Sequence, residues 1–217
     1  MKAMFFDMDG TLVDSQADLA ESVNITRRDF GLKELSAEEV IANVGCGAKY
    51  LLENSIPECF GRDATVKIAF DELWGIFRTH YAEHCCDRLT LYPGVRETLE
   101  ELRSRGWALG INTNKPRFAT LRILEHFGLE NLFGDAVVAG GDCERMKPSP
   151  EPLFECARRL SGHTLSREDW MVGDSWTDMR SAEAAGINGA FCTFGFGRLE
   201  DAPVTVRIDT FAELLKL

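Results

Sequence analysis

The sequence lacks the features of several specialised protein classes. No two of its seven cysteines form a C-x-x-C pair, and an odd number argues against a disulfide framework. We therefore expect reduced thiols in a cytoplasmic protein. The opening MKAMFF is not a signal peptide, and no later apolar run approaches the length of a membrane span. We expect no membrane partner.

Positive charge is also scarce. The chain has 24 Lys and Arg residues against 35 Asp and Glu residues, which gives a formal net charge of -11. No cluster of Lys and Arg offsets this charge, so nucleic acid is not an expected partner. An anionic substrate would need positive charge supplied locally at its binding site.

Internal repeats and low-complexity tracts are absent, and the chain instead contains short apolar runs that alternate with helical patterns. The runs predict strands at 3–6, 107–111, 136–139, 170–172 and 190–194. The helical patterns lie at 96–104, 116–127, 151–160 and 178–185. This alternation is typical of an α/β fold, a doubly wound (Rossmann-like) parallel sheet with helices on both faces.

One long segment breaks the alternation. Residues 15–88 show helical patterns and no convincing strand. They predict a helical cap domain, inserted between the first and second strands of an α/β core made of residues 1–14 and 89–217. A chain of 217 residues is long enough for one domain with such an insertion.

Polar residues lie at or shortly beyond the ends of the predicted strands. They are Asp7, Asp9, Thr113, Asn114, Lys147, Asp174 and Asp178. In an open parallel sheet, ligands bind beyond the carboxyl ends of the strands, where these residues would meet. Carboxylates gathered from separate strands suit a hard divalent cation, and Mg²⁺ takes one or two carboxylates together with phosphate and water.

Four strings carry a family resemblance: DMDGTLVDS, INTNKP, KPSPEP and VGDSWTD. In this order and spacing they resemble the four motifs of the haloacid dehalogenase superfamily of phosphatases, whose cap lies where the helical segment lies here. The resemblance covers the whole chain. It implies a Mg²⁺-dependent phosphatase that acts through an aspartyl-phosphate intermediate.

The resemblance also implies roles for single residues. Asp7 would be the nucleophile, and Asp9 the acid that protonates the leaving oxygen and then the base that activates water. The metal ligands would be Asp7, Asp174 and Asp9, the last through its backbone carbonyl. Phosphate would be bound by Thr113, Asn114 and Lys147. Asp178 would hold a metal-bound water or orient Lys147.

The predicted cap contains a glycine-rich stretch, ANVGCGAKYLL at residues 42–52. By itself it could be an ordinary turn between helices. It also resembles the cap loop of phosphoglycolate phosphatases, in which Gly45 and Gly47 would let backbone amides approach a small carboxylate and Lys49 would add charge. This likeness makes 2-phosphoglycolate the first candidate among small phosphate monoesters.

Other functions stay open at this point. They are a broad-specificity phosphatase of sugar phosphates or nucleotides, a phosphomutase, and a non-catalytic phosphate-binding module. The β-phosphoglucomutases carry Glu-Asp where this chain has Gly173-Asp174, which disfavours a mutase. The presence of both Asp7 and Asp9 disfavours a non-catalytic module. A monomer or homodimer is expected, and Gly195–Gly197 should form a loop after the fifth strand, with nothing catalytic in its chemistry.

Overall fold

The computed structural model describes residues 2–217. The chain divides into two compact units, one made of Met1–Asp14 with Thr90–Leu217 and the other of Ser15–Leu89. The division predicted from sequence placed its second boundary one residue earlier, before Leu89. Leu89 is counted with the helical unit, and its side chain is buried.

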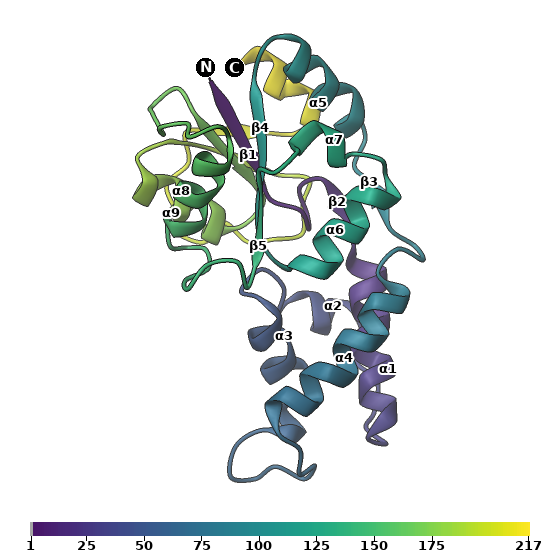
Figure 1. Ribbon diagram of the computed structural model, residues 1–217. Helices are drawn as coiled ribbons and strands as arrows, with labels where there is room; N and C mark the ends of the chain where they lie inside the picture. The colour runs from purple at the N-terminus through teal and green to yellow at the C-terminus, as the bar shows by residue number, and fades with distance from the viewer. Residues whose placement is uncertain (1) are drawn as a thin grey trace. The chain divides into compact units, whose positions relative to one another are not determined.

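The larger unit is built on a six-stranded sheet. Figure 1 labels three of its strands, β5, β4 and β1. Its strands, from one edge to the other, are β5 (Val137–Gly140), β4 (Ala108–Pro116), β1 (Ala3–Phe6), β6 (Trp170–Gly173), β7 (Asn188–Cys192) and β8 (Val206–Ile208). Every neighbouring pair runs parallel. The predicted α/β fold with a parallel sheet is confirmed.

Helices cover both faces of this sheet. They are α5 (Val95–Ser104), α6 (Arg117–His126), α7 (Glu130–Phe133), α8 (Glu151–Arg159), α9 (Trp176–Ala185) and the 3-10 helix η2 (Phe211–Lys216). Figure 1 shows α8 and α9 on one face and α5, α6 and α7 on the other. Phe5 faces the first group, whereas Phe6 points the opposite way and packs against Phe133 and Phe211. Successive side chains of a strand alternate between faces, so a strand covered on both sides must be apolar throughout.

Some elements are not visible in the sequence pattern. The antiparallel pair β2 (Val13–Asp14) and β3 (Thr90–Leu91), the edge strand β8 and the helix α7 are too short to give a periodic signal. The apolar run 107–111 predicts a strand that stops at Ile111, but β4 continues to Pro116. After an irregularity its pairing with β5 resumes at Pro116 and Gly140, so polar residues continue the strand.

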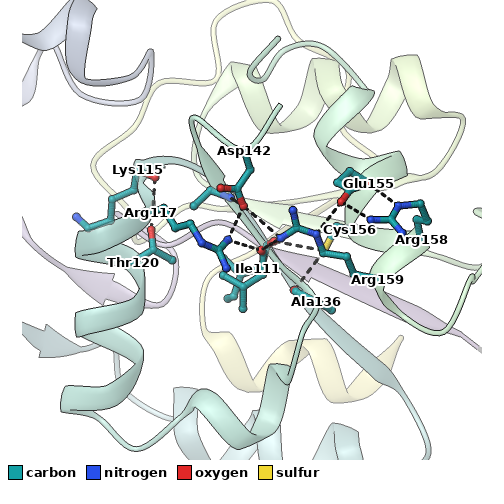
Figure 2. Close-up of polar contacts among 12 residues, drawn as sticks. Ile111, Lys115, Arg117, Thr120, Ala136, Asp142, Glu155, Cys156, Arg158 and Arg159 are labelled. Atoms are coloured by element: carbon teal, nitrogen blue, oxygen red, sulfur yellow. Dashed lines mark hydrogen bonds and ion pairs between the residues drawn. The ribbon is translucent and has the colours of Figure 1, made fainter. Parts of the chain in front are cut away.

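The outer edge of β5 is covered by two arginines (Figure 2). Arg117 and Arg159 both donate to the carbonyl of Val137, at 3.1 and 2.5 Å, and both contact Asp142 Oδ2, at 2.5 and 3.2 Å. An edge strand exposes backbone groups to which another chain can pair. The guanidinium groups occupy one such acceptor, which gives this charged cluster a structural role.

The smaller unit is helical. Its elements are α1 (Gln16–Asp29), α2 (Ala37–Ile41), α3 (Ala48–Ser55), the 3-10 helix η1 (Pro57–Cys59) and α4 (Phe70–His84), and its residues, all of them described, contain no strand. A buried Arg27 ties the unit together through Glu58, at 2.9 Å, and the carbonyls of Lys33 and Ser55. Across residues 2–217, no helix combines the length and the apolar character needed to cross a membrane.

Candidate active site

Asp7 occupies the centre of the sheet's carboxyl edge. It follows β1 directly, and its backbone N–H still donates to the carbonyl of Val172 in β6, at 2.9 Å. The chain then turns sharply, and Gly10 adopts a φ of +76°, a left-handed conformation that glycine tolerates. The Asp7 carboxylate is therefore held by the most buried strand of the sheet.

Lys147 connects two of the predicted site carboxylates. Its Nζ lies 2.9 Å from Asp7 Oδ1 and 2.6 Å from Asp178 Oδ1, and its side chain is almost fully buried. Burial alone would lower the pKa of Lys147, but the charges of Asp178 and Asp7 raise it above its usual value. Lys147 consequently carries a positive charge in the interior, beside the predicted nucleophile.

Asn114 holds the backbone of Lys147 from both sides. The Asn114 Nδ2 donates to the Lys147 carbonyl at 3.0 Å, and the Lys147 N–H donates to Asn114 Oδ1 at 2.9 Å. In the structure the Asn114 side chain bonds to the backbone of Lys147, and the phosphate binding that the sequence predicts for Asn114 stays a prediction. Thr113 lies one position earlier in β4, and its Oγ1 accepts from the Lys115 N–H at 3.2 Å. A hydroxyl that accepts can still donate its own proton to a ligand oxygen.

The carboxylate of Asp9 forms an ion pair that the sequence pattern does not reveal. Lys115 Nζ lies 2.6 Å from Asp9 Oδ1, and the Lys115 side chain is 1% exposed. Lys115 comes two residues after Thr113, and side chains at such positions of a strand point to the same face. That spacing would have placed Lys115 at the site had β4 been expected to continue past Ile111.

Asp174 and Asp178 come from the adjoining turn and helix. Asp174 follows β6, and Asp178 lies in the first turn of α9, where its Oδ2 accepts from the N–H and the hydroxyl of Ser175 at 3.0 and 2.7 Å. Burial raises the pKa of Asp178 to about 6, against the opposing charge of Lys147. Of the two roles expected for Asp178, the contacts correspond to the orientation of Lys147.

Three of these carboxylates form a group suited to a metal ion. One oxygen each of Asp7, Asp174 and Asp178 lies within 4.8 Å of the others. With all three carboxylates ionised, as a bound cation would favour, they and the ammonium of Lys147 carry a formal charge of −2. Burial, together with repulsion from Asp178 and Asp7, raises the pKa of Asp174 well above its usual value. An all-oxygen group with this charge fits a hard divalent cation, which would relieve that repulsion.

Gly45, Gly47 and Lys49 belong to the smaller unit. Both glycines adopt left-handed φ values, +106° and +88°, in the connection between α2 and α3. Lys49 lies in the first turn of α3, with a side chain 67% exposed and 3.8 Å from Glu53. The loop therefore has the backbone conformation that its glycines allow, and its part in substrate binding stays a prediction.

Comparison with known proteins places these residues in a wider context. Residues 4–192 match the family described as haloacid dehalogenase-like hydrolase. A phosphoglycolate phosphatase of Haemophilus influenzae is 33% identical, over 100% of this chain and 97% of its own length. One from Chromobacterium violaceum is 34% identical, over 100% and 96%. A crystal structure described as a predicted phosphoglycolate phosphatase of Haemophilus somnus superposes with a TM-score of 0.88 at 32% identity, over 100% of this chain and 97% of that one.

Proposed function

The chain belongs to the haloacid dehalogenase-like hydrolases and is a phosphatase of that family. From this premise we propose that it is a Mg²⁺-dependent hydrolase of small phosphate monoesters, with 2-phosphoglycolate as its first candidate substrate. The observation that carries the proposal is the position of Lys147 between Asp7 and Asp178, beside Asp174. This group combines a nucleophile, a fixed positive charge and carboxylates for a divalent cation.

The first step would transfer the phosphoryl group to Asp7. A carboxylate oxygen of Asp7 attacks phosphorus, and the bond from phosphorus to the ester oxygen breaks. Lys147 is already 2.9 Å from Asp7, so it offsets negative charge where the phosphoryl group arrives. The hydroxyl of Thr113 donates a hydrogen bond to a phosphoryl oxygen. Asp7, Asp174 and the backbone carbonyl of Asp9 would hold Mg²⁺, which would supply further neutralisation of negative charge.

Asp9 would act as the general acid in the first step and as the general base in the second. As the ester bond breaks, Asp9 gives a proton to the leaving oxygen. In the second step its carboxylate takes a proton from water, whose oxygen attacks phosphorus and releases inorganic phosphate and the free Asp7 carboxylate. The contact with Lys115 fixes Asp9 near the end of β4 before the substrate binds. Lys115 therefore acts in this scheme by placing the acid–base group.

Position 173 supports hydrolysis over mutase activity. A Cβ at Gly173 would lie 2.2 Å from Asp178 Cγ and 2.3 Å from its Oδ2, which is much closer than atoms can approach. The Glu-Asp pair of the β-phosphoglucomutases therefore does not fit while Asp178 holds Lys147. The local packing is that of a site with no acidic side chain at this position.

The substrate choice rests on the names of the relatives and on the glycine loop of the smaller unit. Several relatives at 33–34% identity over nearly the whole chain are named phosphoglycolate phosphatases. Lys49 and the amides near Gly45 and Gly47 would bind the carboxylate of 2-phosphoglycolate. Broader activity on sugar phosphates or nucleotides is the second candidate, since the core residues contact only the phosphoryl group in this scheme.

A panel assay tests the proposal. Phosphate release is measured for 2-phosphoglycolate, sugar phosphates and nucleoside monophosphates, with Mg²⁺ and then with EDTA, for the native protein and for Asp7→Asn. We expect selective release from 2-phosphoglycolate that EDTA and Asp7→Asn both abolish. Release spread evenly over the panel would remove the substrate assignment and leave the mechanism. Substantial activity of Asp7→Asn would remove the covalent mechanism.

A further inference from the structure

The loop that follows β7 closes around the side chain of Asp174. Gly197 donates its backbone N–H to Asp174 Oδ2 at 2.7 Å. Three glycines, Gly10, Gly195 and Gly197, approach the same carboxylate from different parts of the chain. Asp174 is 3% exposed, so these backbone segments account for much of what surrounds it.

No side chain fits at any of the three positions. A Cβ on Gly10 would lie 1.8 Å from Asp174 Oδ2. One on Gly195 would lie 2.4 Å from the Asp174 Cβ and 2.3 Å from the Gly10 carbonyl oxygen. One on Gly197 would lie 2.5 Å from the Asp174 carbonyl oxygen and 2.9 Å from Oδ2. Most of the atoms met are backbone or belong to a short, buried side chain, so they cannot easily move aside.

Backbone conformation does not explain the glycines of the loop. Gly10 has a φ of +76°, which disfavours other residues by itself, but Gly195 and Gly197 are not among the glycines with positive φ. At 195 and 197, the φ angle therefore does not by itself disfavour a side chain. The need for glycine at these two positions is therefore one of space beside Asp174.

We propose that Gly195 and Gly197 are positioning residues for Asp174, and that the loop they form sets the affinity of the site for a divalent cation. The loop binds Oδ2 and restricts rotation of the carboxylate, which fixes the orientation in which Asp174 would meet a cation. Groups that orient a metal ligand commonly change metal affinity by about 10- to 100-fold when they are altered. The inference rests on the metal dependence proposed above and adds a determinant that contains no catalytic group.

Metal binding to the purified full-length protein tests this role without reference to activity. Mn²⁺ binding is measured by electron paramagnetic resonance, and Mg²⁺ by competition, for the native protein, Gly195→Ala and Gly197→Ala. We expect each variant to bind about 10- to 100-fold more weakly. Gly110→Ala is the matched control, because a Cβ there would meet Cys156 Sγ at 2.6 Å in the core, away from Asp174. It should lose stability and keep its metal affinity.

A measurement on the native protein covers the case in which the variants do not fold. In a ¹⁵N–¹H spectrum, the Gly197 amide resonance should shift as Mg²⁺ is added and saturate at the concentration that occupies the site. Folded variants with native affinity, or a Gly197 amide that ignores bound Mg²⁺, would overturn the role of the loop and leave the proposed phosphatase intact. A native protein that binds neither cation would overturn both proposals.

Discussion

Replacing Lys147 by methionine removes the one positive charge among three buried carboxylates. The Nζ lies 2.9 Å from Asp7 and 2.6 Å from Asp178, and the change takes the formal charge of the group from −2 to −3. Removing one partner of a buried ion pair typically costs about 3–5 kcal/mol. For a chain of this size, about 1 kcal/mol shifts Tm by about 2–4 °C, so the metal-free variant should melt about 6–20 °C lower.

Added Mg²⁺ should then separate the electrostatic effect from a packing defect. A divalent cation compensates the missing ammonium, so saturating Mg²⁺ should raise the Tm of Lys147→Met by more than that of the native protein. Phosphate release should nevertheless fall by about 10²–10³-fold, because the fixed charge at the phosphoryl group is lost. Tm is measured by calorimetry in EDTA and across a Mg²⁺ titration.

The control is an arginine whose ion pair is exposed. Arg158 contacts Glu155 at 2.7 Å with a side chain 70% exposed, so Arg158→Met should cost less than about 1 kcal/mol and leave the response to Mg²⁺ unchanged. A Lys147→Met protein that melts within 2 °C of the native protein in EDTA, a limit of roughly 1 kcal/mol, would refute the electrostatic role of Lys147. An equal rise in the Tm of Lys147→Met and of the native protein on addition of Mg²⁺ would refute it as well.

Three other substitutions test separate parts of the site. Lys115→Met should slow the first step, phosphoryl transfer to Asp7, by about 10²–10⁴-fold for alkyl phosphates and barely change it for p-nitrophenyl phosphate, whose leaving group needs no proton. Rapid-quench measurement of the first turnover isolates this step from hydrolysis of the aspartyl-phosphate, in which Asp9 acts on every substrate; equal losses on both esters would contradict a role in placing the general acid. Asn114→Ala should lower the free energy of unfolding, measured by urea denaturation, by about 1–3 kcal/mol, because it leaves the backbone N–H and carbonyl of Lys147 without their partners. A change within experimental error would show that these two hydrogen bonds contribute no net stability. Lys49→Ala should raise KM for 2-phosphoglycolate and leave kcat unchanged. The control is Lys67→Ala at an exposed position of the same unit, which should change neither constant. Steady-state kinetics that show no difference between the two variants would remove Lys49 from the substrate site.

The fold follows from the sequence wherever burial and periodicity coincide. The run at residues 3–6 is apolar at every position because helices cover both faces of β1. An uninterrupted apolar run of this kind can be recognised in the sequence. The helical segment 15–88 is recognisable for the complementary reason, since nothing in it resembles a buried strand. The short elements β2, β3 and β8 escape because two or three residues carry no periodic signal.

The sequence predicts which residues form the site more completely than it predicts which of them contact one another. Strand ends placed Asp7, Lys147 and Asp174 at one edge, and the structure places them there. The pairing of Lys115 with Asp9 and the use of Asn114 to hold Lys147 depend on β4 continuing through polar residues, which an apolar run does not indicate. The approach of the 195–197 loop to Asp174 depends on tertiary packing alone.

Position 173 constrains how this site can change over time. Because its missing side chain is the space that Asp178 fills, the two positions cannot be altered independently. A substitution at Gly173 should be severe when Asp178 is present and mild once position 178 has become small, so the order of the two changes decides whether the intermediate protein survives. Homologous sequences that carry a side chain at position 173 should accordingly have a small residue at 178. A laboratory redesign would have to introduce both changes together.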